Sequence, residues 1–309
     1  MRDPRKGRSR DRQRGWNGLA RIAALGVIGL VVLARSAAAQ GISGQGDATR
    51  GEYLFRAAGC YACHTRPVSG ARPLAGGRAF ETSYGTFYSP NITPDPDHGI
   101  GNWGLADFAR ALRLGEAPDG SHYFPAFPFP SYTGMQDRDL ADLWAYLRGV
   151  DPVPRANREH ELNFPFGFRF LAGVWKWLFF EAGAFEPDPG KDALWNRGAY
   201  LARHLGHCGE CHTPRNALGA LKDGLHFAGT LEGPDGKKVP NITPHPSDGI
   251  GEWSESDIAF FLQLGVMPDG DVAGGAMEDV IREGTGHLSE IDRKAIAAYL
   301  KSLPEHAGP

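Results

Sequence analysis

The sequence predicts a mainly α protein built from two related domains in tandem, with long loops rich in glycine and proline. The chain repeats itself at an interval of about 150 residues, and several segments carry apolar residues at helical spacing. Glycine (42) and proline (23) are abundant among the 309 residues, but 41% of the chain is hydrophobic. This combination indicates ordered loops between short helices rather than disorder.

The repeat is visible in three matching blocks. The first block is Arg-Gly-x-Tyr-Leu, at residues 50–54 and 197–201. The second is Asn-Ile-Thr-Pro followed by Gly-Ile-Gly-x-Trp, at 91–103 and 241–253. The third is Pro-Asp-Gly, at 118–120 and 268–270. We therefore expect one domain over residues 40–150 and a second over 191–309, joined by a linker of residues 151–190.

The first 39 residues are typical of a signal peptide. They hold nine arginines and lysines and an apolar stretch from Ile22 to Ala34, and Ala37-Ala38-Ala39 offers small residues for cleavage before Gln40. The apolar stretch is short for a bilayer-spanning helix. We expect export with cleavage, and an uncleaved anchor is the alternative.

The remaining chain is acidic. Residues 40–309 carry 24 Lys and Arg against 34 Asp and Glu, a formal net charge of −10 compared with −3 for the whole sequence. An acidic surface is a poor match for nucleic acid, so we expect no nucleic-acid partner. It suits a protein partner that presents a basic face.

Each domain is expected to contain the same helices. One helix leads into a cysteine motif, a middle helix covers Leu105–Leu114 or Glu255–Leu264, and a last helix begins near Asp137 or just after Ser289. Ser289 and Asp292 resemble a capping box. The predicted inward face of the final helix consists of Leu288, Ile291, Ala295, Tyr299 and Leu303.

All four cysteines lie in two copies of Cys-x-x-Cys-His, at residues 60–64 and 208–212. This pattern is typical of covalent c-type haem attachment, because two thiols at this spacing can form thioethers with the haem vinyl groups. The next histidine supplies the proximal iron ligand. We predict two haems c, with the following residues at the sites: Cys60, Cys63 and His64 for the first, and Cys208, Cys211 and His212 for the second.

Two other interpretations of the cysteines fit the sequence less well. A four-cysteine zinc site usually has its two pairs roughly 15–20 residues apart, whereas 144 residues separate Cys63 from Cys208. A thioredoxin-like redox pair would sit in a βαβ pattern, which the sequence lacks.

The linker is unusually aromatic. Its segments Phe164–Phe170 and Leu171–Phe180 are interrupted by Arg169 and Lys176, and they are too short and too charged to cross a membrane. We interpret the linker as a strap packed across the two domains. Docking on a partner subunit or on the membrane surface is the alternative.

Several blocks together resemble the multi-haem cytochrome c subunits of bacterial membrane-associated alcohol, gluconate, sorbitol and aldehyde dehydrogenases. They are Trp195–Leu201, Gly206–Asn216, Tyr123–Pro128 and both Asn-Ile-Thr-Pro blocks. The resemblance implies two class-I cytochrome c-like domains in the periplasm, soluble or peripherally attached to the inner membrane. It also implies two partners, namely a dehydrogenase catalytic subunit of the flavin, quinone-cofactor or molybdenum type and a respiratory electron acceptor.

In that family the sixth iron ligand is usually a methionine that precedes the last helix. Met277 lies seven residues after Gly270, and we predict that it binds the second iron. Phe127 occupies the matching position in the first domain and offers no ligand atom. The candidates there are Met135, His122 and an open or water-bound iron.

The function expected from these features is electron transfer from a partner dehydrogenase to a respiratory acceptor, without catalysis by the chain itself. The alternative is a self-contained haem enzyme, a peroxidase or a sulfur-compound dehydrogenase, in which an open first haem binds substrate. Phe127 is the feature of the sequence that favours this alternative.

Overall fold

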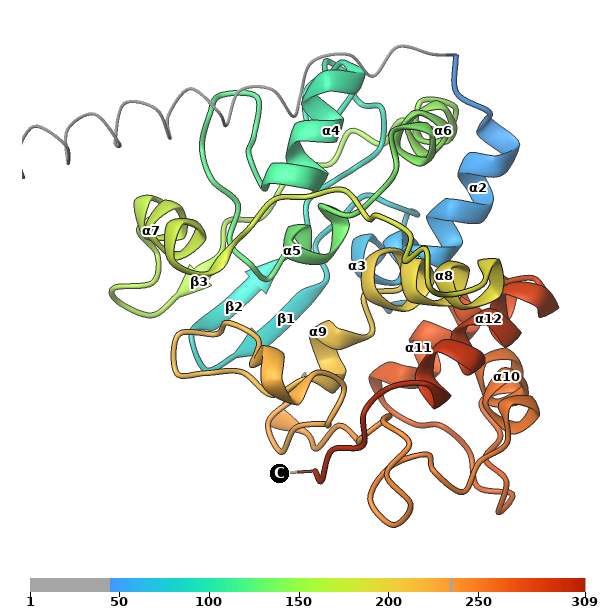
Figure 1. The fold of residues 1–309 in the computed structure, drawn as a ribbon. Helices are drawn as coiled ribbons and strands as arrows, with labels where there is room; N and C mark the ends of the chain where they lie inside the picture. Colours follow the sequence, from blue (N-terminus) through green and yellow to red (C-terminus); the bar gives the residue numbers. More distant parts are fainter. Residues whose placement is uncertain (1–44, 234–235, 309) are drawn as a thin grey trace, which may run out of the picture. The chain divides into compact units, whose positions relative to one another are not determined.

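The computed structural model describes residues 45–233 and 236–308, and its helices follow the repeat (Figure 1). The predicted signal peptide, residues 1–39, lies outside the described residues. The first repeat contains α2 (Ala48–Ala57), α3 (Cys60–His64), α4 (Leu105–Leu114), α5 (Phe129–Tyr132) and α6 (Asp137–Leu147). Helix α2 begins where the Asp47 carboxylate accepts the backbone N–H groups of Thr49 and Arg50, and α4 ends at Gly115 with a φ of 59°.

The second repeat has the same order of helices with some additions. It contains α8 (Ala193–Tyr200), the π-helix η1 (Leu201–Leu205), α9 (Gly209–His212), the 3-10 helix η2 (Asp223–Leu225), α10 (Glu255–Leu264), α11 (Ala276–Glu283), the 3-10 helix η4 (Thr285–His287) and α12 (Glu290–Lys301). The predicted bounds of both middle helices, α4 and α10, are confirmed. The prediction of a mainly α protein is confirmed as well.

Two details predicted for α12 differ from the structure. Ser289 caps the helix by accepting the N–H of Asp292, but the Asp292 carboxylate binds Arg197 and Tyr53 instead of returning to the cap. Ile291 was expected to face inward and is 70% exposed. Leu288, Ala295 and Tyr299 are buried as predicted. The buried face is wider on the side of Ile296 and Leu300, because α12 packs against both α8 and α10.

A small antiparallel sheet in the first repeat was not predicted. Strand β1 (Ala79–Thr82) pairs with β2 (Gly85–Tyr88), and β2 pairs with β3 (Glu161–Leu162), which comes from the predicted linker. The beginning of the linker therefore completes the first repeat.

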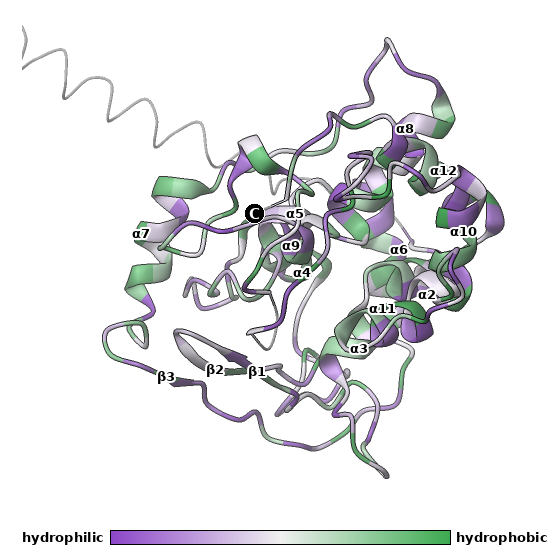
Figure 2. Ribbon diagram, turned by 90° about the horizontal axis from the view of Figure 1, so that it is seen from below, coloured by the Kyte–Doolittle hydropathy of each residue, from purple (hydrophilic) through white to green (hydrophobic). Residues whose placement is uncertain are grey.

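Further along, the linker forms α7 (Phe170–Phe179), which contacts both repeats. Lys176 Nζ lies 3.1 Å from Glu116 Oε1 of the first repeat, and Trp175 Nε1 donates to the carbonyl of Leu218 in the second (2.9 Å). The linker therefore contacts both repeats, as a strap would, and leaves most of the large apolar side chains of α7 exposed. Figure 2 shows that α7 consists mostly of hydrophobic residues. Among the described residues, no helix combines the length and the apolar character needed to span a membrane.

The two repeats share one hydrophobic core within a single compact unit. Helix α2 packs on α6 and α8 packs on α12, and the first helix of each repeat also reaches the last helix of the other. The Tyr53 hydroxyl donates to Asp292 and the Tyr200 hydroxyl donates to Asp139, both over 2.6 Å. The two bonds are equivalent, because each joins a tyrosine near the start of one repeat to an aspartate in the last helix of the other repeat.

Candidate haem-attachment sites

The first Cys-x-x-Cys-His motif forms the short helix α3, which follows Gly59 in the left-handed conformation (φ 64°). Its histidine is fixed by a backbone group, since His64 Nδ1 lies 2.8 Å from the carbonyl oxygen of Pro90. A proton on Nδ1 leaves Nε2 with a free lone pair, which is the form that binds a metal. Burial lowers the pKa of His64, and this keeps the imidazole neutral.

The second motif has the same geometry. His212 Nδ1 lies 2.8 Å from the carbonyl oxygen of Pro240, and burial lowers the pKa of His212. His207 takes the place of Gly59 before this motif and also has a positive φ, 38°. Both histidines are therefore oriented as proximal ligands would be.

The repeated Asn-Ile-Thr-Pro block holds the proline carbonyl in place. Asn91 follows Pro90 and is buried; its side-chain amide donates to the carbonyl of Val153 (2.8 Å), and the Thr93 hydroxyl donates to its Oδ1 (2.7 Å). In the second repeat, Asn241 makes the same kind of bond to His306 (2.7 Å). Residues 153 and 306 are therefore equivalent, and the structural repeat extends beyond residue 150.

The cysteines fit covalent attachment better than redox chemistry. No disulfide joins the four cysteines, all of which the structure describes, and Cys60 and Cys208 pack against the hydrophobic core. Burial raises the pKa of both Cys60 and Cys208 to about 12 and that of Cys211 to about 11. A reactive thioredoxin-like pair needs a lowered thiol pKa. In each site, two sheltered thiols and one neutral imidazole therefore match the requirements of haem c.

The register of the distal loops agrees with the sequence spacing. The backbone N–H of Tyr123 donates to the carbonyl of Gly115 (2.9 Å), and Ala273 makes the equivalent bond in the second repeat (2.7 Å). Counting four residues onward from each donor places Phe127 opposite Met277. Met277 is the second residue of α11 and is partly buried against the core.

The two ligand candidates of the first site lie in different surroundings. Met135 is fully buried just before α6, at the place that Leu288 occupies in the second repeat, and its carbonyl accepts a bond from Arg113 Nε (3.2 Å). His122 lies in a polar cluster beside α7, with Nδ1 3.2 Å from Lys176 Nζ. The identity of the first distal ligand stays a prediction.

The structure also brings the two motifs toward each other, which sequence reasoning missed. Tyr132 of α5 donates to the carbonyl of Ala58, just before the first motif (2.7 Å), and its ring centroid lies 5.4 Å from that of His207, just before the second. Next to it, the Ser131 hydroxyl donates to Glu210 inside the second motif (2.7 Å). These partners are about 75 residues apart in sequence, so no local pattern indicated them.

Comparison with known proteins agrees with this geometry. Residues 48–151 match the family model described as cytochrome c. The chain is 46% identical to a protein named diheme cytochrome c-type from Cereibacter sphaeroides, over 84% of this chain and 86% of that protein.

Two further relatives are longer. The chain is 43% identical to the gluconate 2-dehydrogenase cytochrome c subunit of Pantoea cypripedii and 38% identical to the cytochrome c subunit of an alcohol dehydrogenase (quinone) of Gluconobacter oxydans. The matches cover 82% and 90% of this chain, respectively, and 59% of each relative. The chain thus spans somewhat more than half of these two subunits.

Proposed function

This chain belongs to the cytochrome c family, and we propose that it carries electrons through two haems c from a partner dehydrogenase to a respiratory acceptor. The observation that carries the proposal is the pair of equivalent Cys-x-x-Cys-His sites, packed against each other in one unit with each histidine fixed by a proline carbonyl. Relatives named as cytochrome c subunits of dehydrogenases support this role.

The residues of each site hold and insulate a redox centre. Haem c supplies a one-electron couple at its iron when it is bound. The cysteines fix the group covalently, while His64 and His212 are held in the tautomer that exposes Nε2. One cysteine of each site, Cys60 or Cys208, packs against the hydrophobic core. A site fixed by covalent bonds and by a held histidine suits electron transfer because little has to move when the charge changes.

We place the protein in the periplasm, either soluble or peripherally attached to the inner membrane. The basic and apolar pattern of residues 1–39 supports export, and the attachment motifs suit an exported protein. The net charge of −10 over residues 40–309 favours association with a partner that presents a basic face. Raising the ionic strength should therefore slow electron delivery to the chain without altering the spectrum of either haem.

We further propose that the aromatic face of the linker docks on the dehydrogenase subunit. Within the described segment 164–179, eight large apolar side chains are exposed: Phe164, Phe166, Phe168, Phe170, Val174, Trp177, Leu178 and Phe179. Arg169 and Lys176 turn back to bond His122 and Glu116 of the first repeat. Lys176 is buried by these contacts, whereas Arg169 stays exposed, so the face is mostly apolar with one exposed charge. This composition favours an apolar protein surface over anionic lipid headgroups.

The docking proposal can be tested with a matched pair of variants. The reductant would be solubilised membranes of the source organism supplied with gluconate, ethanol or fructose, and the readout the rate of haem reduction. Trp177→Gln with Phe164→Gln should slow reduction about tenfold or more, because aromatic anchors at an interface contribute about 2 kcal/mol or more. Phe260→Gln on α10, which removes an exposed ring from the second repeat, should have no effect.

Three outcomes would contradict the proposal. Equal rates for all variants would exclude the aromatic face as the docking site. If Trp177→Gln with Phe164→Gln lost binding to phospholipid vesicles and kept its reduction rate, the face would serve membrane attachment instead. A high-spin first haem that consumes added hydrogen peroxide would favour the self-contained enzyme.

A further inference from the structure

Helix α11, which carries Met277, buries few of its own side chains. Of its eight residues, all of which the structure describes, Ile281 alone is buried. The helix starts after Gly275 without a side-chain cap and ends at Gly284. A helix of this length with flexible glycines at both ends depends on tertiary contacts for its position.

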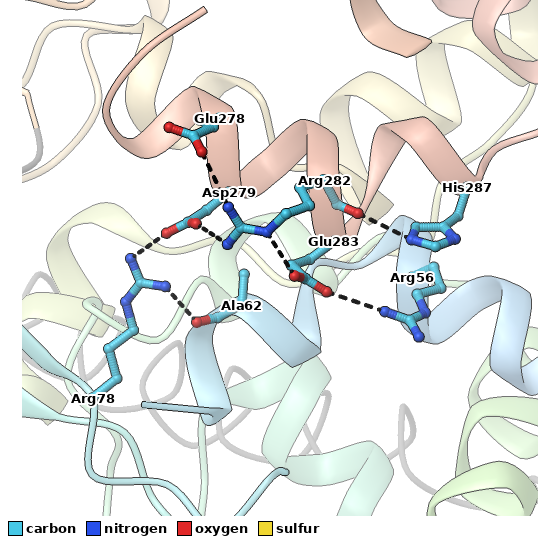
Figure 3. Close-up of polar contacts among 8 residues, drawn as sticks. All are labelled: Arg56, Ala62, Arg78, Glu278, Asp279, Arg282, Glu283 and His287. Carbon is cyan, nitrogen blue, oxygen red and sulfur yellow. Dashed lines mark hydrogen bonds and ion pairs between the residues drawn. The ribbon is translucent and has the colours of Figure 1, made fainter. Parts of the chain in front are cut away.

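Two arginines of the first repeat supply such contacts (Figure 3). Arg78 Nη2 lies 2.9 Å from Asp279 Oδ2, and Arg56 Nη1 lies 3.4 Å from Glu283 Oε2. Asp279 and Glu283 are one turn apart on α11, so both pairs hold the same face of the helix. The four side chains are only about a fifth to a quarter exposed, which makes these pairs stronger than fully exposed ones.

Arg78 also holds the first haem-attachment motif. Its Nη1 donates to the carbonyl of Ala62, which lies between the two cysteines of that motif (2.7 Å), and its backbone N–H donates to Ser89 Oγ (3.1 Å). A planar guanidinium can serve two acceptors in fixed directions at once. One side chain therefore joins the first motif to the helix that carries Met277.

The second repeat shows that this arginine is not a general requirement of the fold. The backbone N–H of Gly76 donates to the carbonyl of His64, and that of Gly229 donates to the carbonyl of His212, both over 2.8 Å. These bonds make Gly76 and Gly229 equivalent positions. Two residues after them lie Arg78 in the first repeat and Leu231 in the second, and Leu231 is exposed. The arginine is thus specific to the contact between the repeats.

We propose that Arg78 is a positioning residue for the second haem. Anchored on the first motif, it fixes α11 and thereby the Met277 sulfur that binds the second iron. The inference rests on the proposed role of Met277. It predicts that a side chain of the first repeat controls the ligation of the haem in the second.

The test compares four variants of the full holoprotein. Arg78→Leu copies the residue of the second repeat, and Asp279→Asn cuts the same link but leaves the bond from Arg78 to Ala62. Arg282→Gln is the matched control, because Arg282 belongs to the same charged cluster but does not link α11 to the first repeat through an ion pair between described residues. Its acidic partners in the described part of the chain all lie on α11: Glu278, Asp279 and Glu283. Met277→Leu identifies which redox component and which part of the ferric sulfur-to-iron charge-transfer band belong to the second haem.

The readouts are that charge-transfer band, the midpoint potentials, and the rate at which cyanide binds the ferric protein. Cyanide must displace the sulfur, so a looser α11 speeds its binding. Arg78→Leu and Asp279→Asn should both bind cyanide about tenfold faster, which corresponds to about 1.4 kcal/mol. Both should lower the potential of the component that Met277→Leu identifies, and Arg282→Gln should leave all three readouts near those of the wild type.

Three results would overturn the proposal in distinguishable ways. If Met277→Leu changes neither the band nor the potentials, Met277 is not the ligand and the assignment of the site fails. If Met277→Leu removes part of the band while Arg78→Leu and Asp279→Asn behave like Arg282→Gln, the ligand assignment stands and Arg78 has no positioning role. A shift confined to the first haem in Arg78→Leu would also contradict it.

Discussion

The two repeats agree on the proximal side of their sites and differ on the distal side. Each has a histidine held by a proline carbonyl and a buried asparagine that fixes the loop after that proline. The distal segments share one turn and then diverge. The first continues into α5, a four-residue helix with Phe129 and Tyr132 buried, and the second into the longer and more exposed α11.

The segments that pack beside the two distal parts differ as well. In the first repeat, the linker strand β3 extends the small sheet, and helix α7 lies beside the distal loop, where His122 bonds Lys176. The second repeat instead has α11 held by arginines of the first. The duplication has therefore kept the geometry that attaches and orients a haem, while the distal segment has been adapted to a different neighbour in each repeat.

The largest effect should come from removing one attachment site at a time. Cys60→Ser with Cys63→Ser should leave one haem per chain after denaturation and acid-acetone extraction, and Cys208→Ser with Cys211→Ser should do the same, because each motif forms its own thioethers. The wild type should keep two. Pyridine haemochrome spectra and intact mass would measure the number. Free haem or stoichiometric zinc from the wild type would contradict covalent attachment.

A substitution of Met277 tests whether this residue binds the second iron, which Phe127 at the matching position of the first repeat could not do. Met277→His should keep the second iron low-spin and lower its midpoint potential on the order of 0.1 V, because imidazole stabilises ferric iron more than a thioether and axial ligands span about 0.8 V. The first haem should keep its potential. An unchanged redox titration would exclude Met277 as the ligand.

The first haem offers a smaller and more discriminating test. Met135→Leu removes a sulfur from a fully buried position where the second repeat already carries Leu288, so packing should be preserved. We expect the ferric sulfur-to-iron charge-transfer band to fall by about half, leaving the contribution of Met277. A band of full strength would exclude Met135, and the spin state would then distinguish His122 from an open iron.

Much of the fold and the proximal sites could be predicted because their signals are local. The bounds of α4 follow from apolar spacing that ends at Gly115, and the haem sites follow from a motif of five residues. The strands of the small sheet were missed because they are only two to four residues long and mix polar with apolar side chains. Periodicity needs a longer segment than this to distinguish strands from loops.

The contacts between the repeats could not be predicted, because their partners lie far apart in sequence. Tyr132 and His207 are 75 residues apart, and Arg78 and Asp279 are 201 residues apart. The wrong assignment of Ile291 has a related cause. A helical stripe shows that one face is apolar, but the packing of α12 on two other helices decides which residues are buried.

Tyr53 and Tyr200 make equivalent bonds between the repeats, and removing each hydroxyl shows whether the two bonds stabilise the fold equally. Tyr53→Phe and Tyr200→Phe should each lower the free energy of unfolding by about 1.5–3 kcal/mol, since each removes a hydrogen bond to a carboxylate. Tyr200 should be the costlier site because it is more deeply buried. Denaturant titration of the holoprotein would measure the losses, and Tyr84→Phe, which removes an exposed 3.3 Å bond, is the control.

The pH dependence of the free energy of unfolding is a second test of the bond between Tyr53 and Asp292. Burial alone would raise the pKa of Asp292, but hydrogen bonds from Arg197 and Tyr53 outweigh it and hold that pKa below its ordinary value of 3.8. A carboxylate with a lowered pKa stabilises the fold above that ordinary value, and the contribution is lost as the pH falls through the lowered pKa. The cost of Tyr53→Phe should therefore be constant near neutral pH and shrink as the pH falls from about 3.8 through the lowered pKa. A cost that stays constant in acid would show that the Tyr53 hydroxyl does not act through the Asp292 charge.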